Sequence, residues 1–514
     1  MDRQPGKWVI AATVMVGNIM AVLDSSIVNV ALPDMAGNLG ATIEEITWVV
    51  TGYILANVLI MPIVGMLSAR YGRKRLYMLA IAVFTVASMM CGMAHSLSTL
   101  VLYRAVQGLA GGVLITVPQA VLRESFPPYE QGLAMGVYGM GVVLAPAIGP
   151  TLGGWLTDRY SWPWVFFINV PIGLLNIFMV QRVLSDPPYL ERRRDPIDYP
   201  GLGFMIVGLG AFQLMLEEGQ QDDWFSSTFI VRLAVLAGVG MLLFVWRELV
   251  ADRPAVDLRI LRNLPFAAAT VLGGIMGAGL SGTLFVLPLF LENLLGFPAM
   301  DAGLALMPRS VTMLVAMPVA GRLYNRMGAR LMVAVGLALL IVGYVQLATL
   351  TTQTGIWDLV LPQAWTGVGF SFLFAALSTA ALSRIAKAQM TAATGLYNVV
   401  RQVMGSIGIA VAATTLTRDQ QRYHALLAED TSSALTRDWM ARTTAGMQHL
   451  GASLDVARQR ALGLLELRVS AQAAVLSYNR IFMLVAVLFV VTAPLILLLP
   501  RTAHRGDAVE IAAE

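Results

Sequence analysis

Apolar runs long enough to cross a lipid bilayer follow one another through almost the whole chain, and this repetition constrains the fold more than any other feature. A helix rises about 1.5 Å per residue, so about 20 apolar residues cross the hydrocarbon core. We therefore predict an all-α polytopic membrane protein with fourteen spans. The predicted spans are 8–31, 46–68, 76–94, 98–122, 132–156, 164–184, 198–217, 228–247, 265–291, 300–321, 330–350, 358–382, 392–415 and 479–499.

Composition supports this class and excludes several others. Of the 514 residues, 57% are hydrophobic and only 13% are charged, unlike an ordinary water-soluble domain. The single cysteine, Cys91, excludes a disulfide framework, and the four histidines show no ligand spacing, so we expect no metal. We find no nucleotide-binding loop, no nucleophile–base constellation and no cleavable signal peptide. An enzyme and a cofactor are therefore not expected.

The basic residues set the expected orientation, because Lys and Arg are enriched in short cytoplasmic loops. With a cytoplasmic N-terminus, the basic clusters face the cytoplasm, and short outer loops hold acids such as Glu44 and Asp222. The net charge of +4 then reflects orientation rather than a nucleic-acid partner. An even number of spans returns the C-terminus to the cytoplasm. The clusters are Arg70, Arg73, Lys74 and Arg75; Arg192, Arg193 and Arg194; Arg253, Arg259 and Arg262; and Arg501 and Arg505.

The first span contains an acid, Asp24, between Asn18 and Asn29. A carboxylate at membrane depth costs about 3 kcal/mol or more unless it faces a cavity or a partner. Ending the span near Val22 would make Asp24 the cap of a following element. That alternative leaves only about 15 residues, which are too few to cross the membrane. Asp24 is therefore a candidate functional residue.

The fourth span carries Arg104, in the stretch RAVQG. Counting from the outer ends of their spans, Asp24 and Arg104 both lie roughly 10 Å below the outer surface. An ion pair between them is geometrically possible, and the alternative is that each faces a water-filled cavity. Either arrangement lets Asp24 exchange a proton beside a cation, which a proton carrier requires.

Two links predicted on the cytoplasmic side resemble each other, GMLSARYGRKRL at 65–76 and GRLYNRMGARLM at 321–332. Their spacing indicates a duplicated six-span unit, an arrangement typical of secondary transporters with a site between the halves. Glycines allow a tight turn, and arginines can hold carbonyls or acids in one gate state. The alternative for one such loop is a charged anchor. The candidate gating residues are Gly65, Arg70, Gly72, Arg73, Gly321, Arg322, Arg326 and Gly328.

The fifth span contains APAIGPTLGGWL at 145–156. Prolines bend a helix and glycines let a neighbour approach closely, so the stretch suggests a hinge or a seal, with plain helix packing as the alternative. The candidate residues are Pro146, Gly149, Pro150, Gly153 and Gly154.

A long loop, 417–478, separates the last two spans and falls outside the membrane by the span count. In its second half, apolar residues recur near helical spacing and predict an amphipathic helix. The helix either packs on its own protein or docks a partner. The stripe comprises Leu450, Leu454, Ala461, Leu465, Val469, Ala473 and Leu476.

Taken together, these stretches resemble the major facilitator superfamily, specifically its fourteen-span drug:proton antiporter branch of the Emr/Qac type. The resemblance covers nearly all the chain except the outer loop. Besides the two links, it rests on LDSSIVNVALP (23–33), RAVQG (104–108), APAIGPTLGG (145–154), WPWVFFINVPIG (162–173), DWFSS (223–227), PAVDLRILRN (254–263), LPLFLENLLGF (287–297), AGLALMPR (302–309) and YNVVRQVMGSIGIA (397–410).

The resemblance implies two six-helix bundles, 8–184 and 265–499, with two extra spans within 185–264. It implies export of bulky amphipathic compounds against inward proton flow, with proton coupling at Asp24 and Arg104. The antiporter motif of the family falls on Gly149, Pro150, Gly153 and Gly154. Three positions depart from the family: Ala69 and Asn325 replace the usual acid of the loops, and Pro163 stands where Arg is common. The first two departures put a charge-held cytoplasmic gate in doubt.

We therefore expect a proton-coupled multidrug efflux permease, driven by the proton gradient, in a bacterial inner membrane with both termini cytoplasmic. Expected partners are small-molecule drugs, protons, membrane lipid, a periplasmic adaptor and an outer-membrane channel. One alternative is an exporter of one endogenous metabolite or siderophore, and another is a non-transport sensor or scaffold. Further cavity-lining candidates are Asn29, Gln107, Glu292, Arg309 and Arg401.

Overall fold

A computed structural model describes residues 6–187, 196–429 and 433–500, and these residues form helices joined by turns and short coils. Thirteen helical segments are long and apolar enough to cross a membrane, and one of them, Met300–Leu347, contains two of the predicted spans. The prediction of an all-α polytopic protein with fourteen spans is therefore confirmed. The arginines Arg192, Arg193, Arg194, Arg501 and Arg505 lie outside the described residues.

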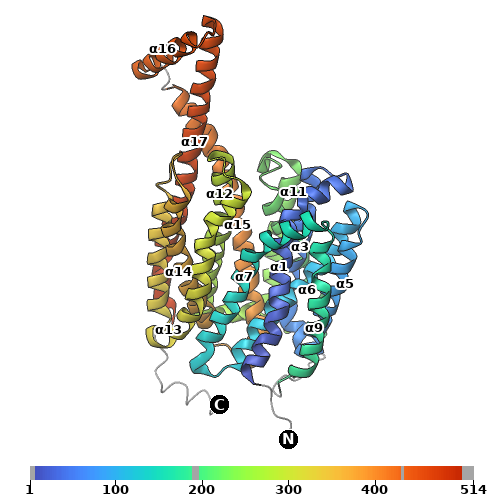
Figure 1. Cartoon of the computed structure of the whole chain (residues 1–514). Coiled ribbons are helices and arrows are strands. Elements are labelled where there is room, and N and C mark those ends of the chain that lie inside the picture. The colour runs from blue at the N-terminus through green and yellow to red at the C-terminus, as the bar shows by residue number, and fades with distance from the viewer. Residues whose placement is uncertain (1–5, 188–195, 430–432, 501–514) are drawn as a thin grey trace.

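The first six spans form one group of helices, which we call the first half (Figure 1). The second span bends through a single 3₁₀ turn, so three elements make up one crossing. The elements are α1 (Lys7–Leu39), α2 (Ile43–Ile46), α3 (Trp48–Ile60), η1 (Met61–Ile63), α4 (Val64–Tyr71), α5 (Arg73–Gly92), α6 (Leu97–Ser125), η2 (Pro128–Glu130), α7 (Gln131–Arg159), α8 (Trp164–Phe167) and α9 (Asn169–Val183).

The last six spans form the second half, together with a helical projection. Gly328 has φ 73°, a left-handed conformation that favours glycine, and it divides α13 into two spans. The elements are α12 (Leu264–Leu289), η5 (Phe290–Leu294), α13 (Ala299–Leu347), α14 (Ile356–Ala381), η6 (Lys387–Gln389), α15 (Met390–Glu429), α16 (Ala434–His449), α17 (Leu454–Thr492) and η8 (Ala493–Leu498).

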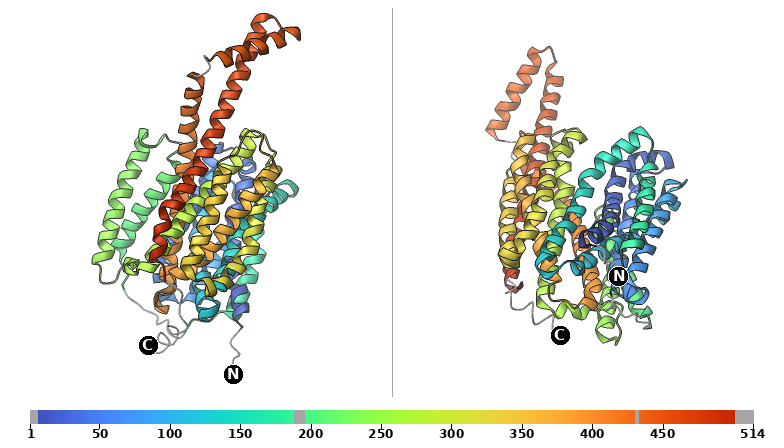
Figure 2. Two further views of the ribbon diagram at one scale, coloured as in Figure 1. Left: turned by 90° about the vertical axis from the view of Figure 1, so that its left-hand side faces the viewer. Right: turned by 60° about the horizontal axis from the view of Figure 1, so that its bottom comes forward.

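Two inserted spans, α10 (Tyr199–Glu218) and α11 (Thr228–Val250), stand at one side of the molecule (Figure 2). The short helix η3 (Trp224–Ser226) lies between them, and η4 (Leu258–Arg262) follows α11. α10 contacts α3 of the first half and α15 of the second. Gln213 of α10 donates a hydrogen bond of 2.7 Å to Ser406 of α15. The inserted pair therefore packs against both halves.

We call the end at which α1 begins the lower end and the end from which α16 projects the upper end (Figure 1). At the lower end the halves pack backbone to backbone. A Cβ on Gly65 would lie 2.5 Å from the Cα of Ala392, and one on Gly321 would lie 2.4 Å from the Gly132 carbonyl oxygen. In each contact, the first glycine of one duplicated link meets the fifth span of the other half. The structure therefore closes the lower end with small residues.

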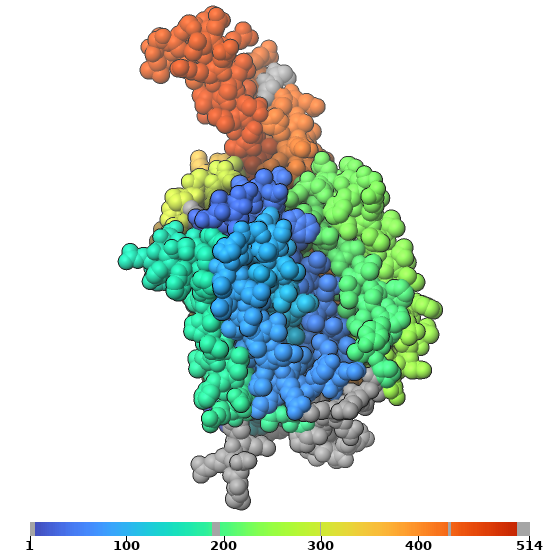
Figure 3. All heavy atoms as spheres, turned by 90° about the vertical axis from the view of Figure 1, so that its right-hand side faces the viewer, coloured from blue at the N-terminus to red at the C-terminus, as the bar shows by residue number. Residues whose placement is uncertain are grey.

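The projection differs from the predicted loop. The spans expected to end at 415 and to begin at 479 continue outward, as α15 to Glu429 and as α17 from Leu454. The segment 409–429 contains no glycine or proline, so nothing in it stops the helix at the membrane surface. Figure 3 shows the resulting hairpin standing clear of the bundle.

The predicted amphipathic helix lies within α17, and part of its apolar stripe is used inside the protein. Ala461 and Ala473 are buried, and Leu465 and Val469 are half-buried, as α17 packs on α15 and α16. Leu450 and Leu454, which begin the stripe, remain exposed. Of the two alternatives, packing on the protein itself accounts for the central part of the stripe.

Candidate functional site

Asp24 lies within α1, and its side chain is fully buried. α1 continues in both directions from Asp24, so the residue is inside a helix and is not the cap of a following element. The apolar residues Ile27, Val28 and Ala31 are buried on the next turns of the same helix. An acid in such a position needs a partner.

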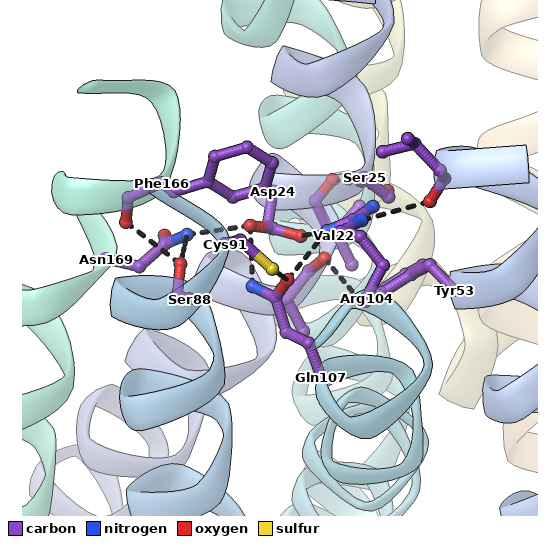
Figure 4. Close-up of polar contacts among 12 residues, drawn as sticks. Val22, Asp24, Ser25, Tyr53, Ser88, Cys91, Arg104, Gln107, Phe166 and Asn169 are labelled. Atoms are coloured by element: carbon purple, nitrogen blue, oxygen red, sulfur yellow. Dashed lines mark hydrogen bonds and ion pairs between the residues drawn. The ribbon is translucent and has the colours of Figure 1, made fainter. Parts of the chain in front are cut away.

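Arg104 of α6 is that partner (Figure 4). Its Nη1 lies 2.5 Å from Oδ2 of Asp24, and both side chains have 0% exposure. The Nε of Arg104 donates to the Val49 carbonyl at 3.1 Å, and its guanidinium lies 4.2 Å from the ring centroid of Tyr53. The structure thus has the ion pair that the estimated depths allow. Removing one partner of a buried pair typically costs about 3–5 kcal/mol.

Neutral side chains complete the surroundings of the carboxylate. The amide groups of Gln107 and Asn169 donate to Oδ1 of Asp24 at 2.8 and 2.7 Å. Asn169 Nδ2 also lies 3.0 Å from Ser88 Oγ, which donates to the Phe166 carbonyl at 2.9 Å. Gln107, expected to line a cavity, is instead fully buried against Asp24. α6 and α9 thus bind the acid directly, and α5 and α8 hold Asn169 in place through Ser88.

The contacts of Asp24 determine which interaction protonation would weaken. Three N–H donors point at its two oxygens, and a carboxylate can accept all three. A proton can bind the free position on Oδ2, and it removes the negative charge that attracts Arg104. Arg104 is the partner whose charge is then left uncompensated. Proton binding would therefore loosen the contact between α1 and α6.

The antiporter-motif candidates pack α7 on the same part of α1. A Cβ on Gly149 would lie 2.5 Å from Ser26 Oγ, and one on Gly153 would lie 2.8 Å from the Ile27 carbonyl oxygen. Gly154 has only Val30 near it, at 3.9 Å. Pro146 and Pro150 lie on the exposed side of the helix. The two buried glycines thus allow α7 to touch the turn that follows Asp24.

The gating-loop candidates lie at the lower end. Gly72 has φ 87°, a left-handed value like that of Gly328, so both copies of the link turn at the same place. Arg73 binds Glu124 through both terminal nitrogens, at 2.6 and 3.0 Å, within the first half. Arg322 and Arg326 are exposed, and Arg70 lies beside the Tyr71 ring.

The departures from the family have structural consequences at this end. Asn325 donates to the Tyr129 carbonyl and so joins the two halves without a charge. Arg123 of α6 donates to the Leu382 carbonyl, a second cross-half contact, at 3.4 Å. The lower end is thus held by neutral acceptors and close glycine packing.

The remaining candidates are scattered. Asn29 is exposed on α1, and Glu292 is exposed in η5. Arg401 lies between the halves, with its guanidinium 5.4 Å from the ring centroid of Phe374. Arg309 is buried and contacts Gln363, far along the chain from the acid site. None of these four contacts Asp24 in the described part of the chain.

Sequence reasoning missed Asn169 and Ser88. Asn169 follows an apolar run, in the stretch WPWVFFINVPIG, and a polar side chain at that depth is the signal that could have identified it. Ser88 gives no such signal, because a serine in a span commonly donates to its own helix.

Two groups of six membrane-spanning helices, related by duplicated links and holding a buried charge pair, define a secondary transporter. The chain belongs to the Major Facilitator Superfamily, whose family model matches residues 14–409. It is thus a multi-pass membrane transport protein rather than an enzyme.

Two named relatives with clear sequence similarity match almost the whole chain. It is 35% identical to the fatty acid resistance protein FarB of Neisseria gonorrhoeae, over 95% of each chain. It is 33% identical to the multidrug export protein EmrB of Escherichia coli K12, over 92% of this chain and 91% of that one. The predicted resemblance to Emr-type transporters is confirmed.

Solved structures support the fold. The human organic anion transporter MFSD10 matches with a TM-score of 0.60 at 14% identity, covering 95% of this chain and all of that one. The proton:xylose symporter XylE matches with a TM-score of 0.58 at 11% identity, covering 94% of each chain. At these identities the likeness concerns the fold alone.

Proposed function

We propose that this chain is a proton-coupled multidrug efflux permease of a bacterial inner membrane, with its lower end and both termini in the cytoplasm. The observation that carries the coupling is the fully buried pair of Asp24 and Arg104. Among the relatives, the protein from Escherichia coli is named a multidrug export protein, which supports the substrate class. Orientation follows from the basic residues of the lower links, such as Arg73 and Arg322.

α7 connects the proton site to the lower end. Its upper part packs on α1 through Gly149 and Gly153, next to Asp24. Its lower part meets the other half, where Gly132 lies against Gly321 and a Cβ on Gly136 would be 2.6 Å from the Met317 carbonyl oxygen. A shift of α1 on protonation therefore reaches the contact that closes the lower end. This arrangement supports alternating access driven by protons.

The substrate would bind between the halves, where polar and aromatic side chains meet. Tyr138 of α7 stacks on Phe374 of α14 with ring centroids 6.1 Å apart, and Arg401 lies over the same Phe374 ring. Asn18 of α1 is fully buried and lies against the Tyr138 hydroxyl. Bulky amphipathic compounds suit a site that combines rings with a few polar atoms.

The function is tested by a drug-susceptibility panel in a host that lacks its own pumps. Wild-type protein should raise resistance to several unrelated amphipathic compounds, and Asp24→Asn should abolish that resistance. Asp34→Asn, an exposed acid of the same helix, is the matched control and should behave as wild type. Resistance to none of the compounds would refute the multidrug proposal and favour a single metabolite or siderophore. Full resistance in Asp24→Asn would remove Asp24 from the coupling.

We also propose that the projection docks a periplasmic adaptor, which in turn meets an outer-membrane channel. The hairpin of α15, α16 and α17 presents large exposed apolar side chains, among them Leu435, Leu450 and Leu467, at 83%, 88% and 66% exposure. Exposed apolar surface on a soluble segment favours a protein partner.

Replacing 417–478 by a short Gly/Ser linker tests this docking. Substrate–proton exchange in proteoliposomes should persist, and resistance in whole cells should be lost, because only export across the second membrane needs the partner. A linker variant that still captures the adaptor and fully protects cells would show that the hairpin is not the docking site.

A further inference from the structure

The second half contains a buried guanidinium that meets no acid among the described residues. Arg309 of α13 is 2% exposed. Its Nε and Nη2 donate to Oε1 of Gln363 on α14, at 2.9 and 2.6 Å. None of the ion pairs found in the described part of the chain includes Arg309. A buried cation without a counter-charge costs several kcal/mol, roughly, so this site is electrostatically incomplete.

Comparison of the duplicated halves shows which group is absent. Gln363 stands seven residues after the start of α14, as Arg104 does in α6. Ser281 stands seventeen residues after the start of α12, as Asp24 does in α1. The neighbouring stretches LDSSIV (23–28) and LSGTLF (280–285) correspond in the same register. The second half therefore has glutamine where the first half has Arg104 and serine where the first half has the acid, and its buried arginine, Arg309, comes from the neighbouring α13.

The unused polar atoms of this site are donors. Arg309 Nη1 and Gln363 Nε2 are buried, and neither has a hydrogen-bond partner among the described residues. Both side chains are at least nine-tenths buried and already touch each other. Two unpartnered N–H groups beside one positive charge are complementary to an acceptor that carries one negative charge. A cation has no acceptor there, because Gln363 Oε1 is already bound twice.

We propose that Arg309 and Gln363 form a binding site for a monovalent anion, either chloride or a single carboxylate group. The anion supplies the counter-charge that Asp24 supplies in the first half. The site is separate from the proton site, so it adds a second, anion-dependent element to the transporter.

Thermal unfolding of the purified full-length protein tests the site without any transport measurement. The protein is unfolded in sodium isethionate, whose bulky anion has no carboxylate group, with isethionate replaced stepwise by chloride or by acetate at constant ionic strength. Wild type should show a saturable rise in Tm of at least about 2 °C, because a ligand that binds only the folded state stabilises it. Response to chloride alone identifies a halide site, and response to acetate identifies a site for carboxylate groups.

Gln363→Glu is the decisive variant. It places a carboxylate within 2.6–2.9 Å of the Arg309 nitrogens and so supplies the charge internally. This variant should unfold in isethionate at the temperature that wild type reaches in the anion that stabilises it, and it should not respond to either salt. Arg322→Gln removes an exposed arginine of α13, the helix that contains Arg309. This control variant should keep the wild-type rise in Tm.

Two results would overturn the proposal. One is a wild-type Tm that neither chloride nor acetate changes. The other is an anion response that Gln363→Glu leaves intact, since the anion would then bind elsewhere. Because the readout is the Tm of the protein, its failure is independent of whether the chain exports drugs or couples to protons.

Discussion

Replacing Asp24 by asparagine keeps the size of the side chain and removes one charge of a buried pair. Asparagine offers one oxygen and one NH₂ group where the carboxylate offers two oxygens. If its oxygen accepts from Gln107 and Asn169, its NH₂ group faces Arg104 Nη1, 2.5 Å from the present oxygen, and two donors then oppose each other. Arg104 is left buried and unpaired.

The expected cost of each single substitution is about 3–5 kcal/mol, the range measured when one member of a buried pair is removed. Arg104→Gln also loses the bond to the Val49 carbonyl and the stacking on Tyr53. The double variant removes both charges together, so no ion remains unpaired. Its destabilisation should be smaller than the sum of the two single values by about 3 kcal/mol, which is the coupling energy of the pair.

The assay is reversible unfolding of the purified proteins in mixed micelles, followed by tryptophan fluorescence, for wild type, both single variants and the double variant. A second cycle with Asp34→Asn and Arg104→Gln serves as the control and should be additive, because Asp34 is exposed. A coupling energy near zero for Asp24 and Arg104 would refute the electrostatic account of the site.

Three other predictions follow from contacts outside this pair. Gly65→Val should disfavour the state with a closed lower end by about 1–3 kcal/mol and reduce transport. Gly203→Val, at a glycine with open space around it, should leave transport unchanged. Transport by the two variants at equal expression tests this prediction. Arg73→Lys should lower thermal stability, because lysine cannot bind both oxygens of Glu124, and thermal unfolding measures the loss. In the projection, the hydrogen bond from His424 holds the pKa of Glu466 below its usual value. The contribution of this contact is therefore present above the ordinary pKa of a Glu side chain and is lost as the pH falls through the lowered pKa of Glu466. Selective-label NMR should show that His424→Ala raises the Glu466 midpoint.

Much of the helical fold could be predicted from the sequence, because the bilayer requires long apolar runs. The expected span 98–122 corresponds to α6, Leu97–Ser125, and 228–247 corresponds to α11, Thr228–Val250. The duplication of the two links could also be predicted, and the structure shows a turn at the corresponding glycines, Gly72 and Gly328. The projection was misjudged because hydropathy marks where a span leaves the membrane and does not mark where a helix ends. α15 continues for fourteen residues beyond 415 without a breaking residue.

The candidate site could be predicted only in part from the sequence. Asp24 and Arg104 stand out because charges are costly inside a span, and their similar depths suggested a pair. Asn169 and Ser88 are uncharged, and which of them faces Asp24 depends on the rotation of α9 and α5, which the sequence does not specify. Gln107 was identified, and its contact with Asp24 was not, because the side of α6 that it occupies is set by packing. Arg309 becomes informative only when the structure shows that no acid in the described part of the chain pairs with it.

The central claim is that Asp24 carries the proton that drives export, and proton flux in proteoliposomes tests it most directly. Liposomes containing the permease and an internal pH-sensitive dye are given a substrate gradient with no initial pH gradient. Wild type and Asp34→Asn should move protons in the direction opposite to the substrate and change the internal pH. Asp24→Asn, at equal incorporation, should leave the internal pH unchanged. An undiminished pH change in Asp24→Asn would contradict the account.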